Sequence, residues 1–350
     1  MSNHLSQAYP TLGERLPVIP LADLPTPVSR SDVTVGSSHR RLSVKHDDVT
    51  ASRYGGNKVR KLEYVLARAR ARHCRRIATF GAVGSNHAVA TALYSGVAGF
   101  ECTCFLSHQS LKPGLGKALR FHQQHGTEVV RLAIDRPSRI EQFRHYLQNR
   151  GVWVVPLGGS SWLGSVGFVN AGLELAAQIG SGELPCPARI YVALGTMGTA
   201  AGLALGLALA DLPSELHAVR VTAPEYANPA GLQYLIAKTA DLMRHYDDAI
   251  PADLADCVRV VFRDEFVGAG YGRTTAATDA AIAWADEELD ITLESTYSGK
   301  TMAAVLHDLG NGFDGEVLFW NTFNSRPLEI DNDLQPDFTV MPREFARYFD

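Results

Sequence analysis

The alternation of short apolar runs with longer amphipathic stretches constrains the fold of this chain more than any other feature. Repetition of strand, helix and strand predicts an α/β fold with parallel sheets, and several runs are apolar throughout, as in strands covered on both faces. The expected strands are Arg76–Phe80, Cys102–Leu106, Glu128–Leu132, Val152–Val155, Ile190–Leu194, Val219–Thr222, Val258–Phe262 and Glu316–Trp320. The expected helices are Val59–Arg72, Asn86–Ala98, Leu115–His125, Ile140–Asn149, Gly164–Ile179, Thr199–Leu209, Gly231–Met243, Thr274–Glu288 and Gly299–Asp308.

Composition excludes several classes of function. The 350 residues carry a net charge of −4 at pH 7, so no overall basic field exists to hold nucleic acid or an anionic membrane. No apolar run approaches the roughly 20 residues of a membrane-spanning helix, and the N-terminus does not resemble a signal peptide. The five cysteines include no CxxC pair, which predicts reduced thiols in a cytoplasmic protein.

The segment Gly55–Glu63, GGNKVRKLE, places Lys58 where a glycine turn meets the start of a helix. The helix dipole and burial both disfavour an ammonium there, and a neutral amine is a nucleophile toward carbonyl groups. Taken alone, the lysine fits a solvated basic helix better, since Arg60, Lys61, Arg68 and Arg70 are nearby.

Two further glycine-containing loops each follow an expected strand. In Gly81–His87, Ser85, Asn86 and the free N–H groups of the following helix would bind a carboxylate, or the side chains would simply cap that helix. In Ala193–Leu203, backbone donors and the hydroxyls of Thr196 and Thr199 would cradle a phosphate, with tight helix–strand packing as the alternative. Neither a nucleotide P-loop nor a GxGxxG fingerprint is present.

The remaining polar segments are weaker signals. Tyr271 and Tyr297 each stand beside glycine at an element boundary, where they would act as acid, base or stacking wall, or would pack in a turn. Cys102 and Cys104 share one face of a strand and are expected in the core. Histidine and cysteine spacing predicts no metal site.

Taken together, these segments resemble the pyridoxal-phosphate (PLP) enzymes of the tryptophan-synthase-β fold (fold type II), and within it the D-cysteine desulfhydrase and 1-aminocyclopropane-1-carboxylate (ACC) deaminase family. The resemblance runs from Leu21 to about Phe323 and rests on LADLPTPV, GGNKVRKLE, SNH, GGSSWLGSVGF, GTMGTAAGL and YSGK in the family's order. It implies two open twisted parallel-sheet domains: a large PLP-binding domain of residues 1–56 and 165–350, and a small inserted α/β domain of residues 57–164. It also implies a homodimer and a small amino-acid substrate.

The resemblance also implies roles for individual residues. Lys58 would form the Schiff base with PLP and then act as a base, and Tyr271 and Tyr297 would face the substrate. Ser85 would be catalytic and, with Asn86 and His87, would bind the substrate; Asn86 would also contact the cofactor's phenolic oxygen. The other cofactor-binding residues would be Gly195, Thr196, Met197, Gly198, Thr199, Ser298 and Thr322.

Ser298 occupies the position that faces the pyridine nitrogen, where ACC deaminases typically have Glu. A hydroxyl leaves that nitrogen mostly neutral and the electron sink weaker, which favours β-elimination. The expected activity is therefore that of a desulfhydrase, yielding pyruvate, ammonia and sulfide. ACC deamination, β-replacement or racemisation of another amino acid, and a non-catalytic binding protein remain alternatives. Departures from the family pattern at Gly84, Arg273–Thr275 and Asn321–Asn324 surround the expected site and bear on the substrate.

Overall fold

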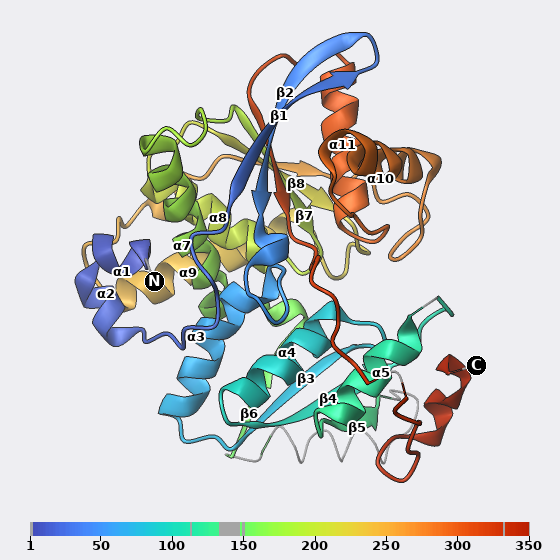
Figure 1. The fold of residues 1–350 in the computed structure, drawn as a ribbon. Coiled ribbons are helices and arrows are strands. Elements are labelled where there is room, and N and C mark those ends of the chain that lie inside the picture. Colours follow the sequence, from blue (N-terminus) through green and yellow to red (C-terminus); the bar gives the residue numbers. More distant parts are fainter. Residues whose placement is uncertain (1–2, 113, 133–147, 149–150, 332, 350) are drawn as a thin grey trace. The chain divides into compact units, whose positions relative to one another are not determined.

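A computed structural model describes residues 3–112, 114–132, 148, 151–331 and 333–349. The chain forms two compact units, both drawn in Figure 1. The first comprises residues 1–16, 22–61 and 160–326, and the second comprises residues 17–21, 62–159 and 327–350. Helix α3 (Lys58–Ala71) begins in the first unit and continues in the second.

The first unit contains a six-stranded sheet in the order β1-β2-β10-β7-β8-β9. These strands are β1 (Val28–Val35), β2 (Ser38–His46), β10 (Val317–Asn321), β7 (Arg189–Leu194), β8 (Glu215–Arg220) and β9 (Val260–Arg263). The pair β1–β2 is antiparallel, and the pairs from β2 through β9 are parallel. Parallel pairing brings the carboxyl ends of the inner strands to one edge, where ligands bind in α/β sheets.

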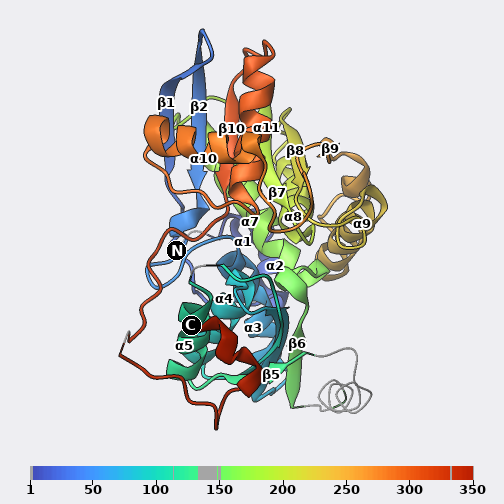
Figure 2. The ribbon, with the colours of Figure 1, turned by 90° about the vertical axis from the view of Figure 1, so that its right-hand side faces the viewer.

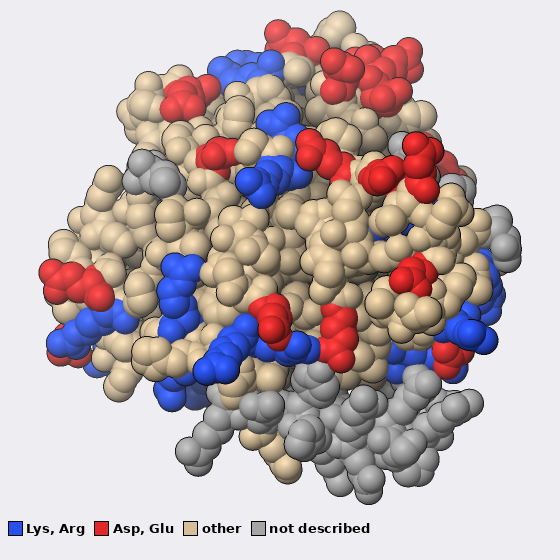
Figure 3. Space-filling view, turned by 60° about the horizontal axis from the view of Figure 1, so that its bottom comes forward, with Lys and Arg blue, Asp and Glu red and all other residues tan. Residues whose placement is uncertain are grey.

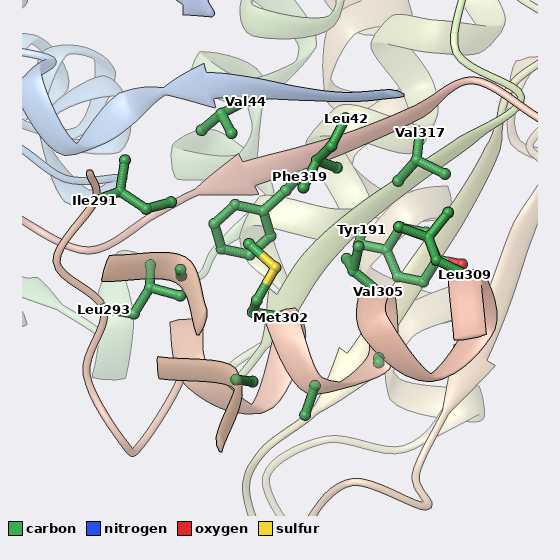
Figure 4. Close-up of a cluster of buried hydrophobic side chains, with 14 of the residues drawn as sticks. Leu42, Val44, Tyr191, Ile291, Leu293, Met302, Val305, Leu309, Val317 and Phe319 are labelled. Carbon is green, nitrogen blue, oxygen red and sulfur yellow. The ribbon is translucent and has the colours of Figure 1, made fainter. Parts of the chain in front are cut away.

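Helices cover both faces of this sheet, as Figures 1 and 2 show. Strand β10 demonstrates the reason, because all five of its residues are buried. Phe319 joins the cluster in Figure 4, where strand residues face Met302 and Val305 of α11. Trp320 points to the opposite face and packs edge-on against Phe168 of α7 at 6.4 Å between ring centroids. The helices of this unit are α1 (His4–Ala8), α2 (Pro10–Arg15), α7 (Trp162–Gly180), α8 (Gly198–Leu209), α9 (Pro229–Tyr246), α10 (Ala276–Leu289) and α11 (Ser298–Gly310), with short turns η1 (Asp47–Val49) and η3 (Leu254–Asp256).

The second unit contains a four-stranded parallel sheet in the order β5-β4-β3-β6. Its strands are β3 (Arg76–Ala82), β4 (Glu101–Ser107), β5 (Glu128–Arg131) and β6 (Val152–Val155). Helix α4 (Asn86–Val97) packs on β3 and β4, and α5 (Leu115–Gln124) packs on β5. The short turns η2 (Leu157–Gly159) and η4 (Arg343–Tyr348) complete its described elements. Cys102 and Cys104 are buried free thiols, which confirms the core assignment.

The α/β class and the two open, mostly parallel sheets confirm the expected fold. Strand β8 begins four residues earlier than expected. The apolar pattern missed this part because it contains the polar His217, which is buried in the structure. The His217 ring lies 4.7 Å from that of Tyr191, and its Nδ1 is 3.0 Å from Nη1 of Arg263. The hairpin β1–β2 was not predicted, since its polar residues interrupt any apolar run. The expected helix Ile140–Asn149 lies outside the described residues apart from residue 148.

The units differ from the expected domain boundaries mainly at the C-terminus. Residues 327–350 group with the second unit, whereas the sequence analysis assigned them to the large domain. The physical reason is burial of Phe345 and Tyr348, with the Tyr348 hydroxyl donating to the carbonyl of Gln109 at 3.0 Å. The division into a large domain of residues 1–56 and 165–350 and a small inserted domain of residues 57–164 stays a prediction.

Basic and acidic side chains intermingle on the face shown in Figure 3, in keeping with the small net charge. Within the described part of the chain, no helix is both long and apolar enough to cross a membrane.

Candidate active site

Lys58 is the first residue of α3, and a tight turn precedes it. A Cβ atom on Gly55 would lie 1.9 Å from the carbonyl oxygen of Asp48, so only glycine fits there. Gly56 has a φ of +85°, a left-handed conformation that glycine adopts at little cost, and its N–H donates to the Asp47 carbonyl at 2.7 Å. The two glycines thus fix the point at which the helix begins.

The Lys58 amine is held at the helix start by two hydrogen bonds in series, the first to an amide and the second from that amide to a hydroxyl. Its Nζ donates to Oδ1 of Asn57 at 2.7 Å, and Nδ2 of Asn57 donates to Oγ1 of Thr199 at 3.0 Å. Burial lowers the Lys58 pKa to about 8, an effect that the Glu294 carboxylate partly opposes. A substantial fraction of the amine is therefore neutral near physiological pH, as a carbonyl-binding lysine requires.

The loop Gly195–Thr199 joins β7 to α8 and forms a cup of donors. Met197 adopts a left-handed conformation with a φ of +68° as the N-cap of α8, and its own side chain makes no capping hydrogen bond. Ser160 closes the cup: its Oγ accepts from the Gly198 N–H at 3.1 Å and lies 2.7 Å from Oγ1 of Thr196. A Cβ atom on Gly198 would lie 2.7 Å from Oγ of Ser160, which is too close for a side chain.

A second lysine reaches this cup from α3. Nζ of Lys61 donates to Oγ of Ser160 at 3.2 Å and lies 5.9 Å from the centroid of the Phe168 ring. Burial, reinforced by the charge of Lys58, holds the Lys61 pKa well below its ordinary value. A phosphate in the cup would reverse that effect, because a nearby anion favours the ammonium. The cup, the helix N-terminus and Lys61 therefore fit a phosphate group.

Tyr271 and Tyr297 meet in the first unit. Their hydroxyl oxygens are 2.8 Å apart and their rings are edge-on, with centroids separated by 5.8 Å. Nζ of Lys58 lies 6.0 Å from the Tyr297 ring centroid. Desolvation raises the pKa of both tyrosines, and the neighbouring Tyr271 and Glu294 raise that of Tyr297 further. Both hydroxyls are therefore protonated at neutral pH and suit proton donation better than proton removal.

Ser298 begins α11 and is 1% exposed. Its Oγ accepts from the backbone N–H of Glu294 at 2.9 Å, and its hydroxyl has long contacts of 3.4 Å to the carbonyl oxygen and to Oε1 of Glu294 as acceptors. The Glu294 carboxylate accepts from the N–H groups of Thr296, Tyr297 and Ser298 at 2.7, 2.5 and 2.9 Å. Glu294 thus accepts hydrogen bonds from the backbone N–H groups of the two residues before α11 and of its first residue.

The segment after β10, which departs from the family pattern, contacts the glycine turn before Lys58. The carbonyl oxygen of Thr322 accepts from the Asn57 N–H at 3.2 Å. Oδ1 of Asn324 accepts from the Gly55 N–H at 2.6 Å. This departure therefore supports the lysine turn directly.

Ser85, Asn86 and His87 lie in the second unit, at the start of α4. Ser85 is its N-cap, with Oγ accepting from the Ala88 N–H at 3.3 Å, as the alternative interpretation of this loop expected. The buried His87 ring lies 2.8 Å from Oγ1 of Thr79 and 3.4 Å from Oγ1 of Thr91. These contacts support α4 itself, and substrate binding by the three residues stays a prediction.

Arg60 stands between the two lysines and enters a buried ion network. Its guanidinium donates to both carboxylate oxygens of Asp47 and to Glu174, and Nζ of Lys45 donates to Glu174 at 2.6 Å. Burial alone would raise the Glu174 pKa, but Arg60 and Lys45 lower it to about 2. The network ties the start of α3 to β2, η1 and α7.

Sequence reasoning missed Asn57, Ser160, Lys61 and Glu294 as site residues. Asn57 and Lys61 stand within the quoted GGNKVRKLE motif and Ser160 within GGSSWLG, so position in these motifs was the available signal. Glu294 offered no such signal, since its function depends on the turn that it caps. Among the residues that the structure describes, no group of three or more His, Cys, Asp or Glu is arranged to hold a metal ion.

The fold and this site define a class: an α/β protein of fold type II, in which a lysine at a helix start accompanies a glycine-containing cup that fits a phosphate. The chain belongs to the family described as pyridoxal-phosphate dependent enzymes, whose profile matches residues 19–322. Its cofactor is pyridoxal 5′-phosphate.

Individual relatives cover nearly the whole chain. Nocardicin C-9′ epimerase of Nocardia uniformis subsp. tsuyamanensis is 32% identical over 92% of this chain and 97% of that protein. D-cysteine desulfhydrase of Klebsiella pneumoniae (strain 342) is 28% identical over 88% of this chain and 94% of that protein. The crystal structure of an ACC deaminase homologue, 24% identical, matches with a TM-score of 0.74 over 92% of this chain and 95% of that chain, which shows the fold.

Proposed function

We propose that the protein catalyses α,β-elimination on a small amino acid, as a D-cysteine desulfhydrase does, releasing pyruvate, ammonia and sulfide. The observation that carries the proposal is the partly buried Lys58 amine, which is hydrogen-bonded to Asn57 and has a pKa lowered to about 8, in the same unit as a cup that fits a phosphate. PLP, when bound, withdraws electron density from the α-carbon of the attached amino acid.

In this proposal Lys58 would hold the cofactor through its amine, and the same amine would remove the α-proton of the substrate. The thiolate that leaves has a lower proton affinity than an alkoxide, so its departure does not require an acid. Thr196, Met197, Gly198 and Thr199 would bind the phosphate, aided by Ser160 and Lys61. Ser298 would donate its hydroxyl hydrogen to the pyridine nitrogen in place of its long 3.4 Å contacts with the Glu294 oxygens, while its Oγ keeps accepting from the Glu294 N–H.

A second candidate function is epimerisation of an amino acid. The relative with 32% identity bears the name of an epimerase, and the tyrosine pair favours the same reaction. Epimerisation needs a donor that returns a proton to the α-carbon, and a tyrosine with a raised pKa stays protonated for that step. Elimination of a thiolate makes no such demand.

An amino-acid panel in deuterated water separates the candidates. D-cysteine, L-cysteine, D-serine and ACC are each incubated with the cofactor-loaded protein, and keto acid, sulfide and α-deuterium are measured. Pyruvate with sulfide from D-cysteine supports elimination, and 2-oxobutyrate from ACC supports deamination. Deuterium and inverted configuration without keto acid support epimerisation. Cofactor binding without any of these supports a non-catalytic binding protein and overturns the proposal.

The family resemblance also leads us to propose a homodimer in the cytoplasm. Light scattering of the purified protein at several concentrations tests the dimer, and a monomer mass throughout would contradict it.

A further inference from the structure

The loop that carries Tyr271 depends on three glycines. Gly268, Gly270 and Gly272 have φ values of +61°, +121° and +68°, all in the region that side-chain-bearing residues rarely adopt. Glycine loses more conformational freedom on folding than any other residue, so this loop requires contacts that hold it. Half of the Tyr271 residue surface is exposed, at 51%, so packing of its own ring supplies only part of that restraint.

The side chain of Lys300 donates hydrogen bonds to the backbone of this loop. The residue is 0% exposed, and its Nζ donates to the carbonyl oxygens of Val267 at 2.6 Å and Gly270 at 2.8 Å. The second of these carbonyls belongs to the peptide bond that leads into Tyr271. One ammonium therefore fixes the backbone at two points, immediately before the tyrosine.

We propose that Lys300 is a positioning residue, which holds the Tyr271 hydroxyl against that of Tyr297. Tyr297 is the N-cap residue of α11, and Lys300 is the third residue of that helix. The start of α11 thus follows directly on one tyrosine and, through Lys300, fixes the backbone that leads to the other. Neither Lys300 contact reaches a reacting atom, so its effect on activity passes through Tyr271. The catalytic part of this inference rests on the proposed function.

Charge rather than bulk is the property that this position requires. Methionine has a similar length but cannot donate, so K300M would leave the Val267 and Gly270 carbonyls without the ammonium. Arginine keeps a cation with several donors, so K300R would restore part of the contact. A purely space-filling role would give the opposite order, because methionine fits the volume better than arginine.

Trypsin cleavage after Arg273 measures the loop without any substrate or cofactor. Arg273 is exposed and lies two residues beyond Tyr271. Loss of two hydrogen bonds to a charged group favours local opening, and we expect K300M to raise the cleavage rate at Arg273 by about fivefold or more. K300R should cleave closer to the wild-type rate. K238M, which changes an exposed lysine of α9, is the matched control and should leave the rate unchanged.

A double-mutant cycle tests the catalytic consequence on whichever substrate of the panel is turned over. K300M should lower kcat more than it raises KM and leave the cofactor absorbance unchanged. In the Y271F background it should cause little further loss, because the hydroxyl that it positions is already absent. Additive losses, or loss of cofactor absorbance in K300M, would overturn the positioning role.

The two measurements distinguish failure of this inference from failure of the proposed function. Equal cleavage at Arg273 in wild type and K300M overturns the inference, whatever the protein catalyses. If K300M does not fold, K300Q and K300R replace it in both measurements, and failure of K300R to approach wild type more closely than K300Q also overturns the inference. Accelerated cleavage in a protein without activity supports the loop contact and overturns only the catalytic assignment.

Discussion

Lys61 donates a hydrogen bond from its Nζ to Oγ of Ser160 at 3.2 Å. The N–H of Gly198 donates to the same oxygen at 3.1 Å. The serine thereby connects the start of α3 with the loop before α8. Since this oxygen also lies 2.7 Å from the Thr196 hydroxyl, it organises three groups that we expect around the cofactor phosphate.

Ser160→Ala should therefore weaken cofactor binding without unfolding the protein. Removing one such hydrogen-bonding group costs about 1 kcal/mol, or about a fivefold rise in the cofactor Kd. Titration of the apoprotein followed by absorbance measures it. Ser165→Ala is the matched control, because Ser165 is buried on α7 and its hydroxyl has no hydrogen-bond partner among the described residues. Equal Kd values for the two variants would refute the assignment.

The rate of cofactor uptake by the apoprotein should rise with pH through a midpoint near 8. The reason is that only the neutral Lys58 amine attacks a carbonyl, and burial lowers its pKa to about 8. The absorbance of the loaded protein is followed between pH 6 and 10, with butylamine as the control for titration of the cofactor itself. Lys58→Ala should show no covalent uptake. A midpoint near the ordinary lysine pKa would mean that the amine is solvated.

Glu174→Gln should lower the free energy of unfolding by about 3–5 kcal/mol, because it leaves Arg60 and Lys45 buried without their shared carboxylate. The Glu174 pKa is lowered to about 2, so its stabilising contribution is present above the unfolded-state value of 4.5 and is lost as pH falls from there toward 2. Urea unfolding at pH 7 measures the difference. Glu316→Gln, which changes a partly exposed carboxylate, is the control and should cost less than about 1 kcal/mol.

His122 predicts a second pH dependence. Its ring is buried on α5 without a hydrogen-bond partner among the described residues, and burial lowers its pKa to about 4. The unfolded state binds the proton more readily, so the free energy of unfolding should fall as pH drops from 6.5 to 4, by up to about 3 kcal/mol. His122→Phe should reduce the change in the free energy of unfolding with pH over this range. His245→Gln, which changes an exposed histidine, should leave that change as in the wild type. If both variants keep the wild-type pH dependence of the free energy of unfolding, His122 is not a buried, neutral histidine.

Apolar periodicity was sufficient to predict the inner strands and most helices, because β3, β4, β7 and β10 are buried along most or all of their length. The hairpin β1–β2 escaped prediction for a physical reason. Lys45 is fully buried only because Glu174 and Gln178, far along the chain, accept its hydrogen bonds. Pairing of this kind depends on tertiary contacts that no local pattern displays.

The candidate site was predictable where a motif fixes backbone geometry, as at Lys58 and the Gly195–Thr199 cup. It was less predictable where a side chain acts through distant partners. Ser160, which lies 38 positions before Gly198 in the sequence, accepts the hydrogen bond that completes the cup. Glu294 accepts from the N–H groups of Tyr297 and Ser298 at the start of α11. Neither contact leaves a trace in residue spacing.

Within four residues, the start of α3 carries three basic side chains into three different surroundings. Lys58 has an amide partner and a depressed pKa, Arg60 is neutralised by two carboxylates, and Lys61 contacts a hydroxyl at the cup. Exchanging Arg60 and Lys61 would preserve composition and net charge, yet it would place a point charge where a planar fork is required and a bulky fork where a slender amine fits. The order of the basic residues in this motif therefore matters more to the local structure than their number, and a graft of this helix start into another scaffold would have to include Asp47 and Glu174, the counterions of Arg60.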